Sequence, residues 1–154
     1  MIFNFSSVFI TGSTGFVGKN IISYFKDSVN YNLYIKNSRI NIKEDVVLHL
    51  AGKAHDLRSN INYKEYYIVN TELTKNVFDS FLKSNAKVFI TMSSVKAVAD
   101  NNSEILYEDS KCNPQTHYGK SKLKAENQII LVCKKNKINY GILRYFNVVG
   151  ASRN

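Results

Sequence analysis

The stretch TGSTGFVG, residues 11–18, decides the fold of this chain of 154 residues. It follows a short apolar run, residues 8–11, with the length and composition of a buried strand. From Phe16 the apolar residues recur with helical spacing as far as Asp27. A glycine-rich turn between a strand and a helix is the context in which backbone N–H groups bind a pyrophosphate. The stretch therefore predicts a βα unit that binds a dinucleotide.

The three glycines of this turn, Gly12, Gly15 and Gly18, have the spacing GxxGxxG. The first allows the tight turn at the end of the strand, the second lets a pyrophosphate approach the backbone, and the third lets the helix pack closely on the sheet. We expect the backbone N–H groups of Phe16 and Val17, at the start of the helix, to face the phosphate oxygens. The alternative is a purely structural turn.

Strands and helices alternate along the rest of the chain. Alternation predicts a strand at residues 31–35, and further strands are predicted at 46–50, 88–92 and 142–146. Helical spacing predicts helices at 16–27, 68–84 and 118–135. Such alternation indicates βαβ crossovers and a parallel sheet that is covered on both faces. We therefore expect one α/β domain with a doubly wound parallel sheet in three layers, α/β/α.

Composition excludes several classes of protein. Hydrophobic residues make up 44% of the chain and charged residues 21%, as in a globular domain. No apolar run approaches the roughly 20 residues of a membrane-spanning helix, and the N-terminus has no signal-peptide pattern. Cys112 and Cys133 have no metal-ligand context, so we expect no metal site and a reducing, cytoplasmic setting. The net charge of +9 comes from scattered lysines, so we expect no nucleic-acid or membrane partner.

The stretch THYGKSKLKAE, residues 116–126, sets Tyr118 and Lys122 four residues apart, on one face of a predicted helix. Tyrosine, with a pKa of about 10, is a poor base at neutral pH. A neighbouring ammonium and the positive ring of an oxidised nicotinamide would both lower that pKa. We therefore expect Tyr118 to take a proton from a substrate hydroxyl while Lys122 also binds the nicotinamide ribose. A surface tyrosine packed on a lysine stem is the alternative.

Five motifs stand in the order of a known family. They are TGSTGFVG, HLAG at residues 49–52, SS at 93–94, YGKSK at 118–122 and LRYFN at 143–147. Over essentially its whole length the chain resembles the extended short-chain dehydrogenase/reductases, the NAD-dependent sugar epimerase/dehydratase family. The resemblance implies that residues 1–154 form a Rossmann-like NAD(P)-binding domain without the C-terminal lobe that closes over the sugar nucleotide. We then expect little or no epimerase activity from the isolated chain.

The resemblance assigns roles to individual residues. Ser94 is the catalytic serine and contacts the substrate, with Ser93 as its neighbour near the cofactor. Asn147 contacts the phosphate of the nucleotide sugar, and Phe146 lies along the nicotinamide. The other cofactor contacts that it implies are Gly12, Gly15, Phe16, Val17, Gly18, Leu50, Ala51, Gly52, Asn70, Tyr118, Lys122 and Tyr145.

Four polar positions carry weaker or open assignments. Asn70, near the start of the predicted helix, steadies the cofactor by resemblance, caps the helix, or does both. His49 lies within a predicted strand, and we expect a buried, hydrogen-bonded core histidine rather than a catalyst. The roles of His55 and Asp56 stay open.

The residues after Ser94 bear on the reaction. In the 4,6-dehydratases of this family an Asp-Glu pair follows the serine position, and Val95 and Lys96 stand there instead, which disfavours dehydration by that route. We expect a nucleotide-sugar 4-epimerase, for a UDP-hexose or UDP-N-acetylhexosamine, that oxidises C4 and reduces it again in polysaccharide or cell-surface sugar biosynthesis. The alternatives are a nucleotide-sugar reductase or dehydrogenase, and a non-catalytic dinucleotide-binding module. By resemblance, we expect a homodimer through helices 68–84 and 118–135.

The choice of cofactor depends on the residues after the second strand. An acidic residue there is typical of NAD binding, and this chain has Asn37, Ser38 and Arg39. An arginine would accept a 2′-phosphate, so NADP stays open, and we expect NAD because most epimerases use it. The interval from this strand to HLAG is short for the family, which indicates a missing strand.

Overall fold

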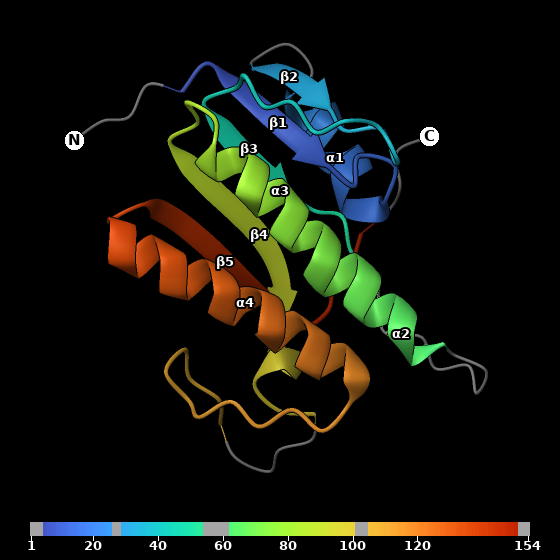
Figure 1. The fold of residues 1–154 in the computed structure, drawn as a ribbon. Coiled ribbons are helices and arrows are strands. Elements are labelled where there is room, and N and C mark those ends of the chain that lie inside the picture. Colours follow the sequence, from blue (N-terminus) through green and yellow to red (C-terminus); the bar gives the residue numbers. More distant parts are fainter. Residues whose placement is uncertain (1–4, 26–28, 54–61, 101–104, 151–154) are drawn as a thin grey trace.

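The computed structural model describes residues 5–25, 29–53, 62–100 and 105–150. In these residues five strands form one parallel sheet in the order β2-β1-β3-β4-β5 (Figure 1). The strands are β1 (Ser7–Thr11), β2 (Asn30–Leu33), β3 (Val46–His49), β4 (Val88–Ser94) and β5 (Asn139–Tyr145). All five overlap strands predicted from the sequence, and the carboxyl ends of β1, β3 and β4 meet at one edge of the sheet.

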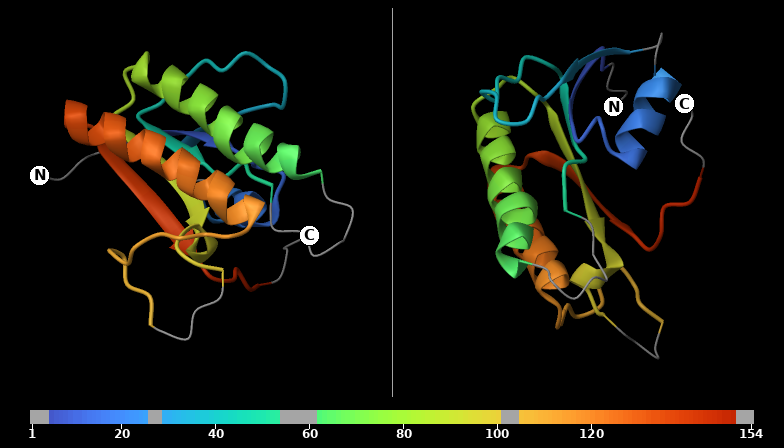
Figure 2. Two further views of the ribbon diagram at one scale, coloured as in Figure 1. Left: turned by 60° about the horizontal axis from the view of Figure 1, so that its bottom comes forward. Right: turned by 90° about the vertical axis from the view of Figure 1, so that its right-hand side faces the viewer.

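Helices cover both faces of this sheet, which confirms the predicted three-layer α/β/α fold. The helical segments are α1 (Phe16–Phe25), α2 (Tyr63–Tyr66), the π-helix η1 (Tyr67–Glu72), α3 (Leu73–Leu82), the 3-10 helix η2 (Val95–Ala97) and α4 (His117–Asn136). Helices α3 and α4 lie side by side on one face, and α1 lies on the other (Figure 2).

The helix that contains Asn70 begins earlier than predicted. Asn62 caps it, since its side-chain oxygen accepts the N–H of Lys64 at 3.2 Å, and α2, η1 and α3 then run on without a break. Asn70 therefore lies inside the helix, in its π-helical turn, and the prediction that it acts as the N-cap is wrong. In α4, by contrast, Thr116 caps the predicted start by accepting the N–H of Gly119 at 3.1 Å.

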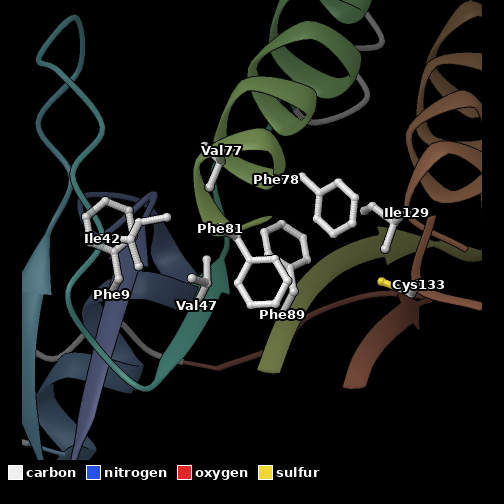
Figure 3. Packing of buried hydrophobic residues seen from close by; sticks show 9 residues of the cluster. All are labelled: Phe9, Ile42, Val47, Val77, Phe78, Phe81, Phe89, Ile129 and Cys133. Atoms are coloured by element: carbon white, nitrogen blue, oxygen red, sulfur yellow. The ribbon is translucent and has the colours of Figure 1, made fainter. Parts of the chain in front are cut away.

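Phe89 is the centre of the larger hydrophobic core and has no exposed surface. Phe78 and Phe81 of α3 pack on it with ring-centroid distances of 5.0 and 5.3 Å, and Ile129 of α4 joins the same cluster (Figure 3). Replacing such a buried phenylalanine by alanine costs about 3–5 kcal/mol. This packing fixes α3 and α4 against the strands whose ends carry the site.

A loop joins β2 to β3, and no helix or strand lies between Leu33 and Val46. Its residue Ile42 is 8% exposed and packs beside Phe9 of β1 (Figure 3). The interval that looked short in the sequence is therefore a loop that covers this part of the sheet by itself.

Candidate functional site

The glycine turn is shaped by close contact with the segment that follows β3. Gly12 has a φ of +74°, and a Cβ there would lie 2.5 Å from the backbone N of Ala51, so only glycine fits. A Cβ on Gly18 would collide with the carbonyl oxygen of Gly12. A Cβ on Gly15 would instead meet one atom, at 3.3 Å. The protein's own packing thus requires two of the three glycines and leaves a tight but milder contact, with the carbonyl oxygen of Gly12, at the third.

Thr11 joins this turn to the segment after β3. The N–H of Leu50 donates to its carbonyl oxygen, and the N–H of Ala51 donates to its Oγ1, both at 3.1 Å. The predicted cofactor contacts Gly12, Leu50 and Ala51 are therefore brought together. Phe16 and Val17 follow the turn in the first turn of α1, where backbone N–H groups have no partner within the helix.

The amine of Lys122 lies beside the same segment. Its Nζ donates to the carbonyl oxygen of Met92 at 3.2 Å. A Cβ on Gly52 would lie 2.9 Å from this Nζ and 3.2 Å from Oδ1 of Asn70. Burial lowers the pKa of Lys122 to about 8, and Glu126 offsets this only in part. The amine therefore lies beside Gly52, in the segment that follows β3 next to the glycine turn.

Asn70 is 1% exposed, and its side-chain amide forms hydrogen bonds with the backbone of Lys53 and with Ser121 of α4. Its Oδ1 accepts the N–H of Lys53 at 2.8 Å, and its Nδ2 donates to the carbonyl oxygen of Lys53 at 3.1 Å. Nδ2 also donates to Oγ of Ser121 at 3.1 Å. Both amide hydrogens are thus used within the protein, so Asn70 fixes the backbone after Gly52.

Tyr118 and Ser94 meet, as the motifs predict. Their side chains are hydrogen bonded, and Tyr66 packs edge-on against the Tyr118 ring at a centroid distance of 5.7 Å. Burial raises the pKa of Tyr118 and the nearby Tyr66 adds to this, while the hydrogen bond with Ser94 acts in the opposite direction. The expectation that Lys122 lowers this pKa is wrong for the protein by itself, because burial raises the pKa and the amine of Lys122 donates to Met92 instead.

Ser93 points to the opposite side of β4 from Ser94. Its hydroxyl donates to the carboxylate of Glu126, which is 2% exposed. The parallel register pairs Ser93 with Arg144 and Ser94 with Tyr145. A cofactor contact by Ser93 would therefore use its backbone.

An ion pair between Glu126 and Arg144 was not predicted. Nη2 of Arg144 donates to Oε2 at 2.6 Å and Nε to the same oxygen at 3.1 Å, and this pairing raises the pKa of Arg144. Arg144 also donates to the carbonyl oxygen of Glu108 at 3.3 Å, which ties the loop before α4 to β5. The signal in the sequence is an acid, Glu126, four residues after Lys122 on a face that continues to Ile129.

His49 is a buried core residue, as predicted. It is 1% exposed, with Nδ1 2.7 Å from Oγ1 of Thr11 and Nε2 2.9 Å from Oγ1 of Thr74. Burial lowers its pKa to about 3, and the positive charge of Lys122 contributes in the same direction.

The remaining predicted site residues lie at the surface. Tyr145 ends β5 beside Ser94 and is 39% exposed, and Phe146 and Asn147 follow it, also exposed. Arg39 is exposed in the loop after β2. His55 and Asp56 lie outside the described residues. Within the described ranges, no cluster of acidic, histidine or cysteine side chains could hold a metal, and no helix is long and apolar enough to span a membrane.

Residues 8–154 match the family described as "NAD dependent epimerase/dehydratase family". The chain belongs to this family. A UDP-glucose 4-epimerase from Vibrio cholerae is 30% identical to it over 172 residues, which cover 94% of this chain and 52% of that enzyme. The chain thus spans about half the length of this curated relative, and the epimerase/dehydratase resemblance drawn from the five motifs is confirmed.

Solved structures share the fold of this epimerase/dehydratase family member. The UDP-glucuronic acid 4-epimerase of Bacillus cereus in complex with NAD superposes with a TM-score of 0.80 at 21% identity, over 96% of this chain and 58% of that one. RMD from Pseudomonas aeruginosa complexed with NADPH gives a TM-score of 0.79 at 21% identity, over 97% and 56%.

Proposed function

We propose that residues 1–154 form the NAD-binding domain of a nucleotide-sugar 4-epimerase, acting on a UDP-hexose or UDP-N-acetylhexosamine. The observation that carries the proposal is the meeting of Ser94 and Tyr118, with Lys122 one helical turn away and beside the glycine turn. The 4-epimerase from Vibrio cholerae, with 30% identity, supports the same reaction class.

In the proposed reaction, the residues of this chain move a proton and hold the reactants. The Ser94 hydroxyl holds the substrate oxygen, and Tyr118 takes the proton of the C4 hydroxyl. A bound NAD would accept and return the C4 hydride and bring a positive ring to the site. Because burial raises the pKa of Tyr118, forming the phenolate requires such positive charge beside it, while Lys122, whose amine donates to Met92, is proposed to bind the nicotinamide ribose.

The glycine turn is the proposed pyrophosphate site. Gly15 is the least crowded of its three glycines, and the first N–H groups of α1 follow it at Phe16 and Val17. The remaining proposed contacts are Gly12, Gly18, Leu50, Ala51, Gly52, Asn70, the Ser93 backbone, Tyr118, Lys122 and Tyr145, with Asn147 and Ser94 on the sugar nucleotide.

NAD is the proposed cofactor, and isothermal titration of the chain with NAD and NADP tests it. We expect NAD to bind more tightly, since most epimerases use NAD; the 4-epimerase of Bacillus cereus was solved in complex with NAD. Tighter NADP binding would reassign the cofactor and make Arg39 the first candidate for the 2′-phosphate. Absence of binding by either dinucleotide would refute the proposed domain function.

The reaction is tested separately, by incubating a full-length homologue with NAD and a panel of UDP- and dTDP-sugars, because the isolated chain is expected to have little or no epimerase activity. Interconversion of C4 epimers by the homologue that is lost in the substitution equivalent to Tyr118→Phe, with NAD affinity retained, is the expected result. Net consumption of NADH would indicate a reductase instead. Undiminished turnover in Tyr118→Phe would contradict the assigned role of Tyr118, and NAD binding without turnover would favour the binding module.

We also propose a homodimer that forms through helices 68–84 and 118–135, on the face of the sheet that α3 and α4 cover. We further propose that the enzyme is cytoplasmic and takes part in polysaccharide biosynthesis. Large apolar side chains are exposed on these helices, with Ile68 at 53%, Leu82 at 40% and Leu131 at 72% exposure. Analytical ultracentrifugation of the wild type and of Leu131→Lys checks this. A wild-type monomer would contradict it.

A further inference from the structure

A buried chain of hydrogen bonds leads from the glycine turn to the π-helix η1 through His49. Oγ1 of Thr74 donates to the carbonyl oxygen of Asn70 at 2.9 Å, and a carbonyl can only accept. The hydroxyl of Thr74 has a single hydrogen, so it must accept from Nε2–H of His49 at 2.9 Å. Nδ1 of the neutral ring is then the acceptor and takes the hydroxyl hydrogen of Thr11 at 2.7 Å.

This order of donors and acceptors leaves no other tautomer for His49. Oγ1 of Thr11 already accepts the N–H of Ala51 at 3.1 Å, so its own hydrogen is free for the ring. Thr11, His49, Thr74 and Asn70 are all at most 4% exposed, so water does not offer alternative partners. The low pKa of His49, about 3, agrees with a neutral ring at pH 7.

The far end of this relay, which runs from Thr11 through His49 and Thr74 to Asn70, holds backbone at the candidate site. The amide of Asn70 both accepts from and donates to the backbone of Lys53, at 2.8 and 3.1 Å. Its Oδ1 and Nζ of Lys122 both lie within 3.2 Å of the position of a Cβ on Gly52. A shift of Asn70 would therefore move the Gly52–Lys53 backbone relative to the amine of Lys122.

We propose that His49 is a positioning residue: through the relay, its fixed Nε2–H tautomer holds Asn70 and the Gly52–Lys53 backbone beside the amine of Lys122. The inference rests on the proposed function only in treating this place as part of a dinucleotide site. The ring also stacks on Phe89 at a centroid distance of 6.2 Å, so its alternative role is that of a hydrogen-bonded core residue that serves packing.

Four substitutions at two buried threonines separate the two roles. Thr74→Val keeps the shape and removes the acceptor for Nε2–H, while Thr74→Ser restores the hydroxyl. Thr91→Val is the matched control: Thr91 is 5% exposed, and its Oγ1 has only a 3.5 Å contact to the carbonyl oxygen of His49. Thr74→Ala serves as a second removal of the hydroxyl should the valine variant not fold.

The first readout needs no ligand. Hydrogen exchange of the Lys53 amide, measured by NMR, reports on its bond to Asn70. We expect exchange about tenfold faster in Thr74→Val or Thr74→Ala, and rates close to wild type in Thr74→Ser and Thr91→Val. Ring ¹⁵N shifts of the wild type should show the Nε2–H tautomer of His49. An Nδ1–H tautomer, or equal exchange in Thr74→Val and Thr91→Val, would overturn the inference.

The second readout is titration with NAD. We expect Thr74→Val to weaken NAD binding about tenfold, with Thr74→Ser and Thr91→Val close to wild type. If the wild type binds no dinucleotide, the proposed function fails, and Lys53 exchange and the ring tautomer still decide the role of His49. If NAD binding is unchanged in Thr74→Val although Lys53 exchanges faster, the relay does not position the dinucleotide site and the inference is wrong.

Discussion

The amine of Lys122 donates to the carbonyl oxygen of Met92, two residues before Ser94, at 3.2 Å. This contact brings the lysine to the strand end that carries the serine, and it leaves the phenol of Tyr118 to Ser94. The phenol of Tyr118 and the amine of Lys122 thus have different hydrogen-bond partners in the protein by itself. They share a function only if a ligand lies between them.

The buried amine of Lys122 predicts an unusual dependence of stability on pH. Its folded-state pKa of about 8 is below the ordinary value of 10.5, so the charge costs stability below pH 8 and the cost is relieved as pH rises toward 10.5. Urea denaturation should show that the wild type gains stability relative to Lys122→Met between pH 8 and 10. The exposed Lys124→Met is the control and should follow the wild type. Parallel pH profiles for wild type and Lys122→Met would contradict the prediction.

Gly15 and Gly18 should respond differently to alanine. Gly18→Ala forces a methyl group into the Gly12 backbone and should cost about 1–3 kcal/mol of unfolding free energy. Gly15→Ala makes one tight contact, at 3.3 Å from the carbonyl oxygen of Gly12, so it should lose less stability than Gly18→Ala, yet bind NAD at least about tenfold more weakly. Thermal unfolding and calorimetric titration of both variants check this. Wild-type NAD affinity in Gly15→Ala would mean that no ligand approaches there.

The Glu126–Arg144 pair should matter through its burial. Arg144→Met leaves the 2% exposed carboxylate of Glu126 without its cation and should cost about 3–5 kcal/mol in urea denaturation. The double variant Glu126→Met/Arg144→Met should recover most of this loss. Lys75→Met, which breaks the exposed Lys75–Asp79 pair, should cost less than about 1 kcal/mol. Equal costs for the two single variants would show that burial of Glu126 is unimportant.

His49 predicts a loss of stability in acid. Its folded-state pKa of about 3 lies below the ordinary 6.5, so the stability it contributes is present above pH 6.5 and is lost as pH falls toward 3. The wild type should lose about 1.4 kcal/mol per pH unit in this window beyond the loss seen in His49→Gln. His117→Gln, a substitution at an exposed histidine, should behave like the wild type. The same slope in His49→Gln would contradict the assignment.

The parts of the site that the sequence predicted are those fixed by local spacing. The glycine turn and the pairing of Tyr118 with Lys122 on one helical face follow from a few neighbouring residues. The opposite directions of Ser93 and Ser94 also follow from strand alternation, because Phe89 and Ser93 lie on one side of β4. The sequence alone therefore contains enough to predict that the side chains of Ser93 and Ser94 point to opposite sides of the sheet.

The parts that were missed depend on contacts between distant segments. The partner of Glu126 is Arg144, which only the pairing of β4 with β5 brings near. Burial raises the pKa of Tyr118, and a sequence motif does not indicate how deeply a side chain is buried. Asn70 was assigned partly as a cap because its helix was expected to begin at residue 68, whereas Asn62 starts it.

The π-helical turn at Tyr67–Glu72 lies between two parts of one helix that make different contacts. Downstream, Phe78 and Phe81 are anchored in the core, and upstream of them Asn70 and Thr71, two successive residues, are both buried. Each residue added to or removed from a helix rotates what lies beyond it by about 100°. Deleting one residue from this turn would therefore swing Asn70 away from Lys53 while the core kept its register. The π-helical turn therefore sets the rotation between the two parts of the helix, so that the core packing of Phe78 and Phe81 and the hydrogen bonds of the Asn70 amide can both form.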